Sequence, residues 1–362
     1  MSMSAAAPPA RILSISGDPA TVALSARVLA VLEERTGQPV NALFHLIVGE
    51  GAGAALALLL GLAHSAQDQQ PPRPASAEAA VPMLAAGLRR RRHGWLGLGL
   101  GLGWDLGRGL GEASEPALTT PTSPLAQVDL SAAVTDIAVP VFDTAQARPF
   151  LFRSWKAQGL YPRAGEGRGR HDFRGHDILR AALRHPVGGP AAVQARSRLG
   201  FEVAGGGALA RDPVSLASLL GRQLYQRAGS LLILSLNFAA PAPASTRARP
   251  YRADNAAVWD RQGQSALNQL TARGMAERLI TLELPRQPAN RYSQQGGDEA
   301  ALDAALQAVL SAEESSGFRG LCHEFAARSA VGHTALRTPM RLLPVPNGDL
   351  SRPAGALGRA RI

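Results

Sequence analysis

The chain has 362 residues, of which 46% are hydrophobic, so it is long enough to bury a substantial core in one large domain with extensions. Its net charge of +10 and its pI of about 11 favour anionic partners such as phospholipid head groups or nucleic acid. Aromatic residues make up only 5% of the chain and form no stacking stripe, so no specific nucleic-acid-binding motif is present.

The first part of the chain predicts strands that alternate with helices. Arg11–Ser16 is apolar and strand-like, and the apolar positions of Ala23–Arg35 recur at helical spacing. Asn41–Gly49 leads into the next feature, a short apolar strand that begins at Leu46 and runs straight into a Gly-x-Gly-x-Gly turn at Gly49–Gly53. The apolar run Ala54–Leu62 that follows is too short to span a bilayer and predicts a buried helix. A strand that enters a helix through such a turn predicts a sharp elbow.

Regular patterning stops between residues 64 and 128, where we predict a low-complexity insertion. The insertion contains four consecutive arginines, Arg89, Arg90, Arg91 and Arg92, followed by alternating glycine and leucine over Trp95–Gly111. One interpretation is a lid that docks on an anionic membrane, with the arginines at the lipid phosphates and the tryptophans at the interface. The other is a flexible surface insertion, because glycine at nearly every second position raises the entropic cost of ordering the chain.

The second half of the chain continues the alternation of strands and helices. The predicted elements are two paired strands at Ala133–Phe142 and Pro149–Phe152, a helix at Asp177–Leu183, a helix with Pro213 in its first turn, a strand at Leu231–Leu236, and a helix at Asp298–Ala312 with Asp298 as its N-cap. This succession predicts an α/β fold, in which helices cover both faces of a mostly parallel central sheet.

The order and spacing of these pieces resemble the patatin-like phospholipases. Arg35-Thr36-Gly37-Gln38-Pro39 and Leu43-Phe44-His45-Leu46-Ile47 match the segments that precede the Gly-x-Ser-x-Gly elbow of that family. The stretch Ala204–Pro213 is similar to the family's Asp-Gly-Gly segment. The resemblance covers Arg11–Leu62 and, more loosely, Phe142–Phe238, and it fades towards about Leu310. It implies a patatin-like three-layer α/β/α fold.

The three catalytic elements that this resemblance carries over are all altered. The family's Ser-Asp dyad corresponds to Gly51 and Ala204, and a glycine has no atom that can attack an acyl carbon. The family's oxyanion loop corresponds to Gly17, Asp18 and Pro19. Pro19 has no backbone donor, and Asp18 would place a negative charge where a negative charge must develop. We therefore expect no catalytic residue, no metal and no cofactor. The other residues of the elbow are Gly49, Glu50 and Gly53.

Several residues leave other interpretations open. A relocated nucleophile could be Ser14, Ser16 or Ser25, although a serine beside a turn is more often structural. Glu50 could act as an acid or a base, but an exposed carboxylate at a helix start usually only favours the positive end of the helix dipole. His45 has no serine or cysteine partner at a suggestive spacing, which favours a core or surface role.

Three functions follow from these observations. The leading hypothesis is a catalytically inactive member of the patatin-like family that binds a lipid, an acyl chain or a protein partner. The second is an active lipid acyl hydrolase with relocated catalytic residues. The third is a basic scaffold protein that binds anionic membrane or nucleic acid.

The expected domain organisation is a flexible N-terminus at residues 1–10, a patatin-like domain at 11–312 that includes the insertion, and a C-terminal extension at 313–362. Cys322 is the only cysteine, so an intramolecular disulfide is excluded and a reducing compartment is expected. The first ten residues show no charged segment followed by an apolar one. We therefore expect a cytoplasmic protein, peripheral on membranes if the arginine segment binds lipid.

Overall fold

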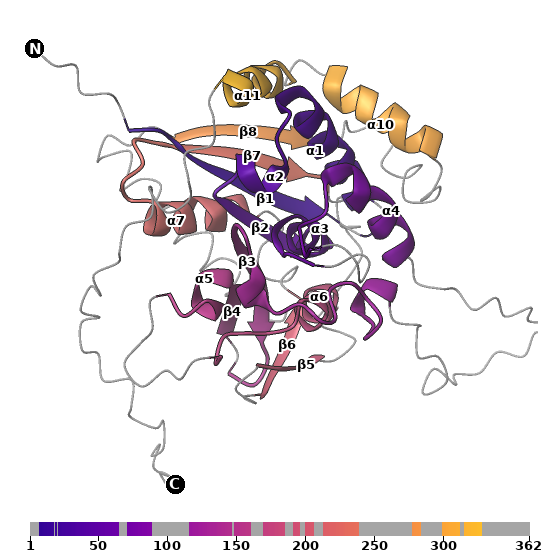
Figure 1. The fold of residues 1–362 in the computed structure, drawn as a ribbon, viewed down its shortest axis with the longest axis vertical. Coiled ribbons are helices and arrows are strands. Elements are labelled where there is room, and N and C mark those ends of the chain that lie inside the picture. The colour runs from indigo at the N-terminus through magenta and orange to yellow at the C-terminus, as the bar shows by residue number, and fades with distance from the viewer. Residues whose placement is uncertain are drawn as a thin grey trace, which may run out of the picture.

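A computed structural model describes residues 7–17, 19, 21–64, 71–88, 116–146, 148–160, 169–184, 191–195, 200–205, 213–238, 277–283, 299–311 and 315–327. These residues form an α/β fold around one eight-stranded sheet, which Figure 1 shows between layers of helices. The strands lie in the order β5-β6-β3-β2-β1-β7-β8, and β4 pairs with β3 beside this path.

The sheet is mixed and mostly parallel, as the sequence predicts. Strands β3, β2, β1, β7 and β8 are parallel to one another, whereas β4 and β6 pair antiparallel with β3, and β5 pairs antiparallel with β6. The strands are β1 (Ala10–Gly17), β2 (Leu46–Gly51), β3 (Asp136–Asp143), β4 (Arg148–Arg153), β5 (Ala191–Gln194), β6 (Gly200–Gly205), β7 (Leu231–Asn237) and β8 (Glu277–Glu283).

Helices lie on both faces of the sheet. They are α1 (Val22–Thr36), α2 (Val40–Leu43), α3 (Gly53–Gly61), α4 (Ala77–Gly87), α5 (Ser154–Ala157), α6 (Gly175–Leu183), α7 (Val214–Leu224), α10 (Glu299–Ser311) and α11 (Ser315–Ala327), with short 3₁₀ turns at Ala117–Thr119 and Leu130–Ala132. In the part of the chain that the structure describes, none of these helices is both long enough and apolar enough to cross a membrane.

The two faces of the sheet bury different side chains because successive residues of a strand point to opposite sides. Leu13 and Ile15 of β1 pack in the core that contains α1, α3 and α11, which we call the α1 face. Ile12 of β1 and Leu46 of β2 pack in a second core with α7, which we call the α7 face. Figure 1 shows α7 on the opposite side of the sheet from α1 and α11.

The boundaries of most predicted elements agree with the structure to within a few residues. The predicted pairing of two strands around residues 133–152 is confirmed, since β3 and β4 form an antiparallel pair. Helix α4 lies inside the segment expected to be a low-complexity insertion, and it packs against α1. Helix α11 lies inside the expected C-terminal extension and contributes Phe318 and Phe325 to the core. The arginine run and Asp298 lie outside the described residues.

A buried polar network joins the amino-terminal ends of three strands to α7. The Tyr225 hydroxyl, at the end of α7, lies within hydrogen-bonding distance of two acceptors, Asp136 Oδ2 (2.5 Å) and the carbonyl oxygen of His45 (2.7 Å), and it has one proton to donate to them. The backbone N–H of Arg11 donates to His45 Nδ1 (2.9 Å), and the guanidinium of Arg11 lies 4.3 Å from the centroid of the Phe325 ring. Of the two roles expected for His45, in the core or on the surface, the structure shows the core role, since its side chain is buried and bonded to the backbone of β1.

A second polar contact fixes the helices on the α1 face. Glu33 of α1 accepts hydrogen bonds through its two carboxylate oxygens from the backbone N–H groups of Val40 (2.9 Å) and Ala77 (2.8 Å). Val40 and Ala77 are the first residues of α2 and α4, where backbone N–H groups have no partner within the helix. One carboxylate therefore caps two helices.

Burial raises the pKa of Glu33 above its ordinary value of 4.5, and the two backbone hydrogen bonds, which lower it, only partly offset this effect. A raised pKa means that the folded state binds the proton more tightly than the unfolded state does. The contribution of Glu33 to stability is therefore most favourable below its ordinary pKa and is lost as the pH rises through the raised value.

We predict that Glu33→Gln lowers the free energy of unfolding, because the new amide NH₂ faces a backbone donor, and that the loss shrinks as the pH rises. Urea unfolding of both proteins between about pH 4 and about pH 7 measures this difference in stability. Over that range the Glu33 carboxyl group ionises, whereas the glutamine of the variant does not. Glu34→Gln, at the exposed neighbouring position, is the matched control. A loss that grows with pH would contradict the prediction.

Candidate functional site

The structure has a sharp turn where the sequence predicts the elbow. Strand β2 ends at Gly51, Ala52 is the N-cap of α3, and the helix begins at Gly53. Gly51 has a φ of +58°, in the left-handed region that favours glycine. Helix α3 behind the turn is buried along its whole length, as expected. The turn therefore has the strand-to-helix form of a nucleophile elbow, with a glycine at its apex.

Two flanking glycines let the helix approach the sheet closely. A Cβ on Gly49 would lie 2.5 Å from the carbonyl oxygen of Gly53, and a Cβ on Gly53 would lie 2.4 Å from the carbonyl oxygen of Ile15. Both contacts are with backbone atoms, which cannot move aside as a flexible side chain can. By contrast, a Cβ on Gly51 would meet only the carbonyl oxygen of Gly17, at 3.2 Å. The apex is thus the elbow position with most room for a side chain.

The first residue of the oxyanion-loop equivalent lies directly beside the apex. Gly17 is the last residue of β1 and pairs with Gly51 in the parallel register. The backbone N–H of Ala52 donates to the carbonyl oxygen of Gly17 (3.2 Å). In hydrolases with this elbow, the N–H of the residue after the nucleophile helps to hold the oxyanion. Here that donor is already in use. Pro19 lies in an exposed turn, and Asp18 lies outside the described residues.

The second dyad position lies at the same edge of the sheet as the apex. Ala204, in β6, pairs with Phe142, the penultimate residue of β3. Strands β2 and β3 are parallel, so their carboxyl ends meet at one edge, and β3 separates β2 from β6. The fold therefore brings Gly51 and Ala204 to one edge of the sheet, one strand apart.

The interpretation of Glu50 as an exposed carboxylate at a helix start is wrong. Glu50 belongs to β2, is only 6% exposed, and pairs with Ser16 of β1. The sequence misled because a glycine-rich turn normally ends the buried part of a strand, whereas β2 stays in the sheet as far as Gly51.

The three serines considered as relocated nucleophiles are all buried. The Oγ atoms of Ser14 and Ser25 have no hydrogen-bond partner, so no base lies within hydrogen-bonding distance of either. Ser16 is 1% exposed and differs from them because its pairing partner on β2 is a glutamate. Ser16 is therefore the one serine of the three that is placed beside a carboxylate.

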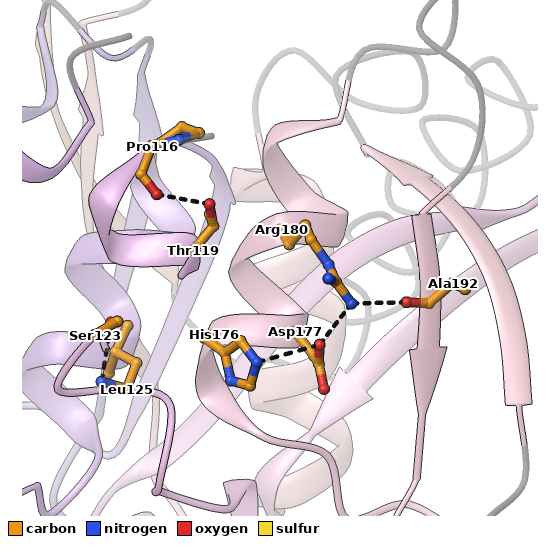
Figure 2. A network of polar contacts seen from close by, with 8 residues as sticks. All are labelled: Pro116, Thr119, Ser123, Leu125, His176, Asp177, Arg180 and Ala192. Atoms are coloured by element: carbon orange, nitrogen blue, oxygen red, sulfur yellow. Dashed lines mark hydrogen bonds and ion pairs between the residues drawn. The ribbon is translucent and has the colours of Figure 1, made fainter. Parts of the chain in front are cut away.

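A further group of polar side chains, shown in Figure 2, lies around α6. Asp177 Oδ1 accepts from Arg180 Nη2 (2.7 Å) and lies 3.5 Å from His176 Nε2. The same Nη2 atom donates to the carbonyl oxygen of Ala192 (3.0 Å) and so joins α6 to β5. The i, i+3 spacing of the aspartate and the arginine was the available sequence signal for this contact. We interpret the group as structural because its contacts fix a helix to an edge strand.

The described residues contain no group of three or more histidine, cysteine, aspartate or glutamate side chains placed to hold a metal ion. The His64 imidazole is buried, and burial lowers its pKa, although a contact with the carbonyl oxygen of Leu59 acts in the opposite direction. Burial likewise raises the pKa of the Cys322 thiol. Both groups are therefore held in their neutral forms.

We predict that Gly51→Ala destabilises the protein more than Gly37→Ala does. Both glycines have positive φ values, +58° and +65°, so each alanine incurs about 1–2 kcal/mol of backbone strain. A Cβ on Gly37 meets nothing within 4 Å, whereas one on Gly51 crowds the carbonyl oxygen that Ala52 binds. Urea unfolding of the two variants measures the difference. Equal losses of stability would contradict the prediction, because they would show that the Gly17 carbonyl oxygen can move to make room for a Cβ at position 51.

Comparisons with known proteins add no relative. No protein-family model matches this chain, and no curated protein matches it. The resemblance to the patatin-like phospholipases therefore rests on the residues quoted above and on the elbow with its neighbouring strands.

Proposed function

We propose that this protein is a catalytically inactive relative of the patatin-like acyl hydrolases, and that it binds a lipid, an acyl chain or a protein partner. The observation that carries the proposal is the elbow between β2 and α3, which has a glycine with a φ of +58° at its apex. In a working serine hydrolase that apex presents the nucleophile.

Three features of the site oppose acyl transfer, each by a separate mechanism. Gly51 has no nucleophilic atom, and the methyl group of Ala204 cannot accept a proton. The N–H of Ala52 is bound to Gly17 instead of facing a developing oxyanion. Loss of one oxyanion donor alone costs roughly 10²–10³-fold in turnover, and loss of a nucleophile costs several further powers of ten. These losses of rate multiply, so the site is better described as inactive than as slow.

The elbow keeps its shape although it lacks the catalytic side chains, so the binding role stays a proposal. The close packing of α3 on β1 and β2, which gives the elbow its shape, is complete without the catalytic side chains. Membrane attachment through Arg89–Arg92 belongs to the same proposal and stays a prediction, since those residues lie outside the described part of the chain. A cytoplasmic or peripheral location is likewise a prediction.

One observation favours the second function, an acyl hydrolase with relocated residues. Ser16 and Glu50 are paired on adjacent strands, both are buried, and both lie beside the elbow. A serine next to a carboxylate has the elements of a nucleophile and its base. This pair makes Ser16 the residue to replace when the two functions are compared. The basic scaffold is supported only by the net charge of +10.

We predict that the double variant Gly51→Ser, Ala204→Asp folds but hydrolyses p-nitrophenyl esters only slightly above a buffer blank. The new serine restores the nucleophile, but Asp18 and Pro19 still oppose the oxyanion. Replacing both of these residues by glycine in the double variant should raise the rate by at least about tenfold, because one oxyanion donor is worth roughly 10²–10³-fold.

The matched control is Gly51→Ala, Ala204→Asp, which carries a side chain of similar size without a nucleophilic oxygen. If the double variant alone reaches the rate of an intact hydrolase, the oxyanion loop is unimpaired and this account of the site is wrong. If the native chain hydrolyses the ester and Ser16→Ala abolishes the activity, the relocated hydrolase replaces the inactive protein.

A further inference from the structure

Four residues connect the end of α3 to the chain that leads into α4. The backbones of His64 and Arg73 exchange two hydrogen bonds, from the His64 N–H to the Arg73 carbonyl oxygen (3.2 Å) and from the Arg73 N–H to the His64 carbonyl oxygen (3.1 Å). The carbonyl oxygen of Leu59, in α3, accepts from the backbone N–H of Ala75 (2.9 Å). We call Leu59, His64, Arg73 and Ala75 the clasp. It holds the chain that enters α4 against α3, and the two helices are in contact (Figure 1).

The imidazole of His64 completes the clasp. The residue is 4% exposed, and its Nε2 lies 3.3 Å from the same carbonyl oxygen of Leu59. A carbonyl oxygen can only accept, so Nε2 carries the proton, and Nδ1 of the neutral ring is an acceptor without a proton. Among the residues that the structure describes, Nδ1 has no hydrogen-bond partner. One carbonyl oxygen therefore holds both the His64 ring and Ala75, which lies just before α4.

The closed clasp has no place for a second proton on His64. Protonation would turn Nδ1 into a buried N–H donor that faces no acceptor, and it would charge a ring that is shielded from water. A buried donor without a partner costs about 1–3 kcal/mol, and an unpaired buried charge costs more. Opening the clasp removes both costs, because the ring then reaches water.

In the described part of the chain, no charged side chain compensates a charge on this ring. Helix α3 carries no charged residue. Burial lowers the pKa of His64, and the one opposing cause is the contact with the Leu59 carbonyl oxygen. Asp68 lies outside the described residues. The charged residues of the neighbouring segments, none of which is a cause of this shift, are Arg27, Glu33, Arg73, Glu78 and Asp129.

We propose that the clasp is a pH-sensitive switch, in which protonation of the buried His64 ring opens the clasp and detaches the start of α4 from α3. Helix α4 buries Val81 and Leu84, so its release uncovers apolar surface. The arginine run Arg89–Arg92 directly follows Leu88, the C-cap of α4. The switch therefore acts on the helix next to the segment predicted to bind membranes. This inference does not depend on the proposed loss of hydrolase activity.

The direction of the pH dependence follows from the lowered pKa of His64. The open clasp binds the proton more tightly than the closed clasp does, so the closed form is most stable above the ordinary histidine pKa of 6.5. That stability is lost as the pH falls from there through the lowered value. Over this range the equilibrium constant for opening rises by up to about tenfold per pH unit. Glu33, which binds the N–H of Ala77, acts in the opposite direction, because its raised pKa makes its contribution more favourable as the pH falls.

Hydrogen exchange of the full chain, measured by mass spectrometry at about pH 7.5 and about pH 5.5, tests the switch. After correction for the intrinsic pH dependence of exchange, the protection of α4 should fall at least about threefold on acidification, whereas that of α7 stays unchanged. Glu33 cannot cause this fall, since its effect has the opposite sign. Constant or increased protection of α4, or an equal fall in α7, would overturn the proposal.

A variant then assigns the effect to His64. His64→Gln should abolish the fall, because the amide can donate to the Leu59 carbonyl oxygen but does not titrate. His323→Gln, at an exposed position of α11, is the matched control and should respond to pH as the native chain does. A full response in His64→Gln would assign the effect to another group and overturn the proposal.

Circular dichroism verifies that both variants fold. If His64→Gln does not fold, exchange of the ring C2 hydrogen of His64 in the native chain decides the proposal, because its rate reports the pKa of that ring. A pKa below 6.5 is expected, and a pKa at or above that value would overturn the proposal.

Discussion

The close approach of α3 to β1 and β2 is the constraint on which the elbow depends. Gly49 and Gly53 allow it, because a Cβ at either position would lie within 2.5 Å of a backbone carbonyl oxygen. With α3 so placed, the chain must turn sharply at Gly51, and Gly17 of β1 becomes its direct neighbour. The hydrogen bond from Ala52 to Gly17 then closes the space in which a hydrolase would hold an oxyanion. The packing of α3 therefore gives the turn the shape of a catalytic elbow. The hydrogen bond from Ala52 to Gly17 nevertheless opposes catalysis at that turn.

The two ends of the parallel strands have different polar chemistry. At the amino ends, Tyr225, Asp136 and His45 satisfy one another in a buried network that joins α7 to the sheet. Towards the carboxyl ends, Ser14 is buried without a hydrogen-bond partner, and Glu50 is buried with Ser16 as its paired neighbour on β1. Satisfied polar groups specify a fold, whereas an unsatisfied one lowers stability unless something else binds it. This contrast distinguishes the carboxyl ends of the strands, where the elbow lies, from their amino ends.

The sequence was sufficient to predict the α/β class, the sheet's mostly parallel character and the elbow, because these depend on local periodicity and on glycine. It did not predict β6 and β8, since the short segment Gly200–Gly205 and the charged ends of Glu277–Glu283 hide their strand character. Nor could it predict which polar residues pair near the carboxyl ends of β2, β1 and β7. Ser16, Glu50 and Asn237 are far apart in the chain and meet only through the register of three strands.

The central claim is that the elbow has no nucleophile and that no other serine has replaced it. Labelling the native protein with a fluorophosphonate, followed by intact-mass measurement, tests this most directly, because such reagents react covalently with activated serines. The account predicts no increase in mass under conditions in which an intact serine hydrolase is fully labelled. Stoichiometric labelling that maps to Ser16, and that disappears in Ser16→Ala, would contradict it.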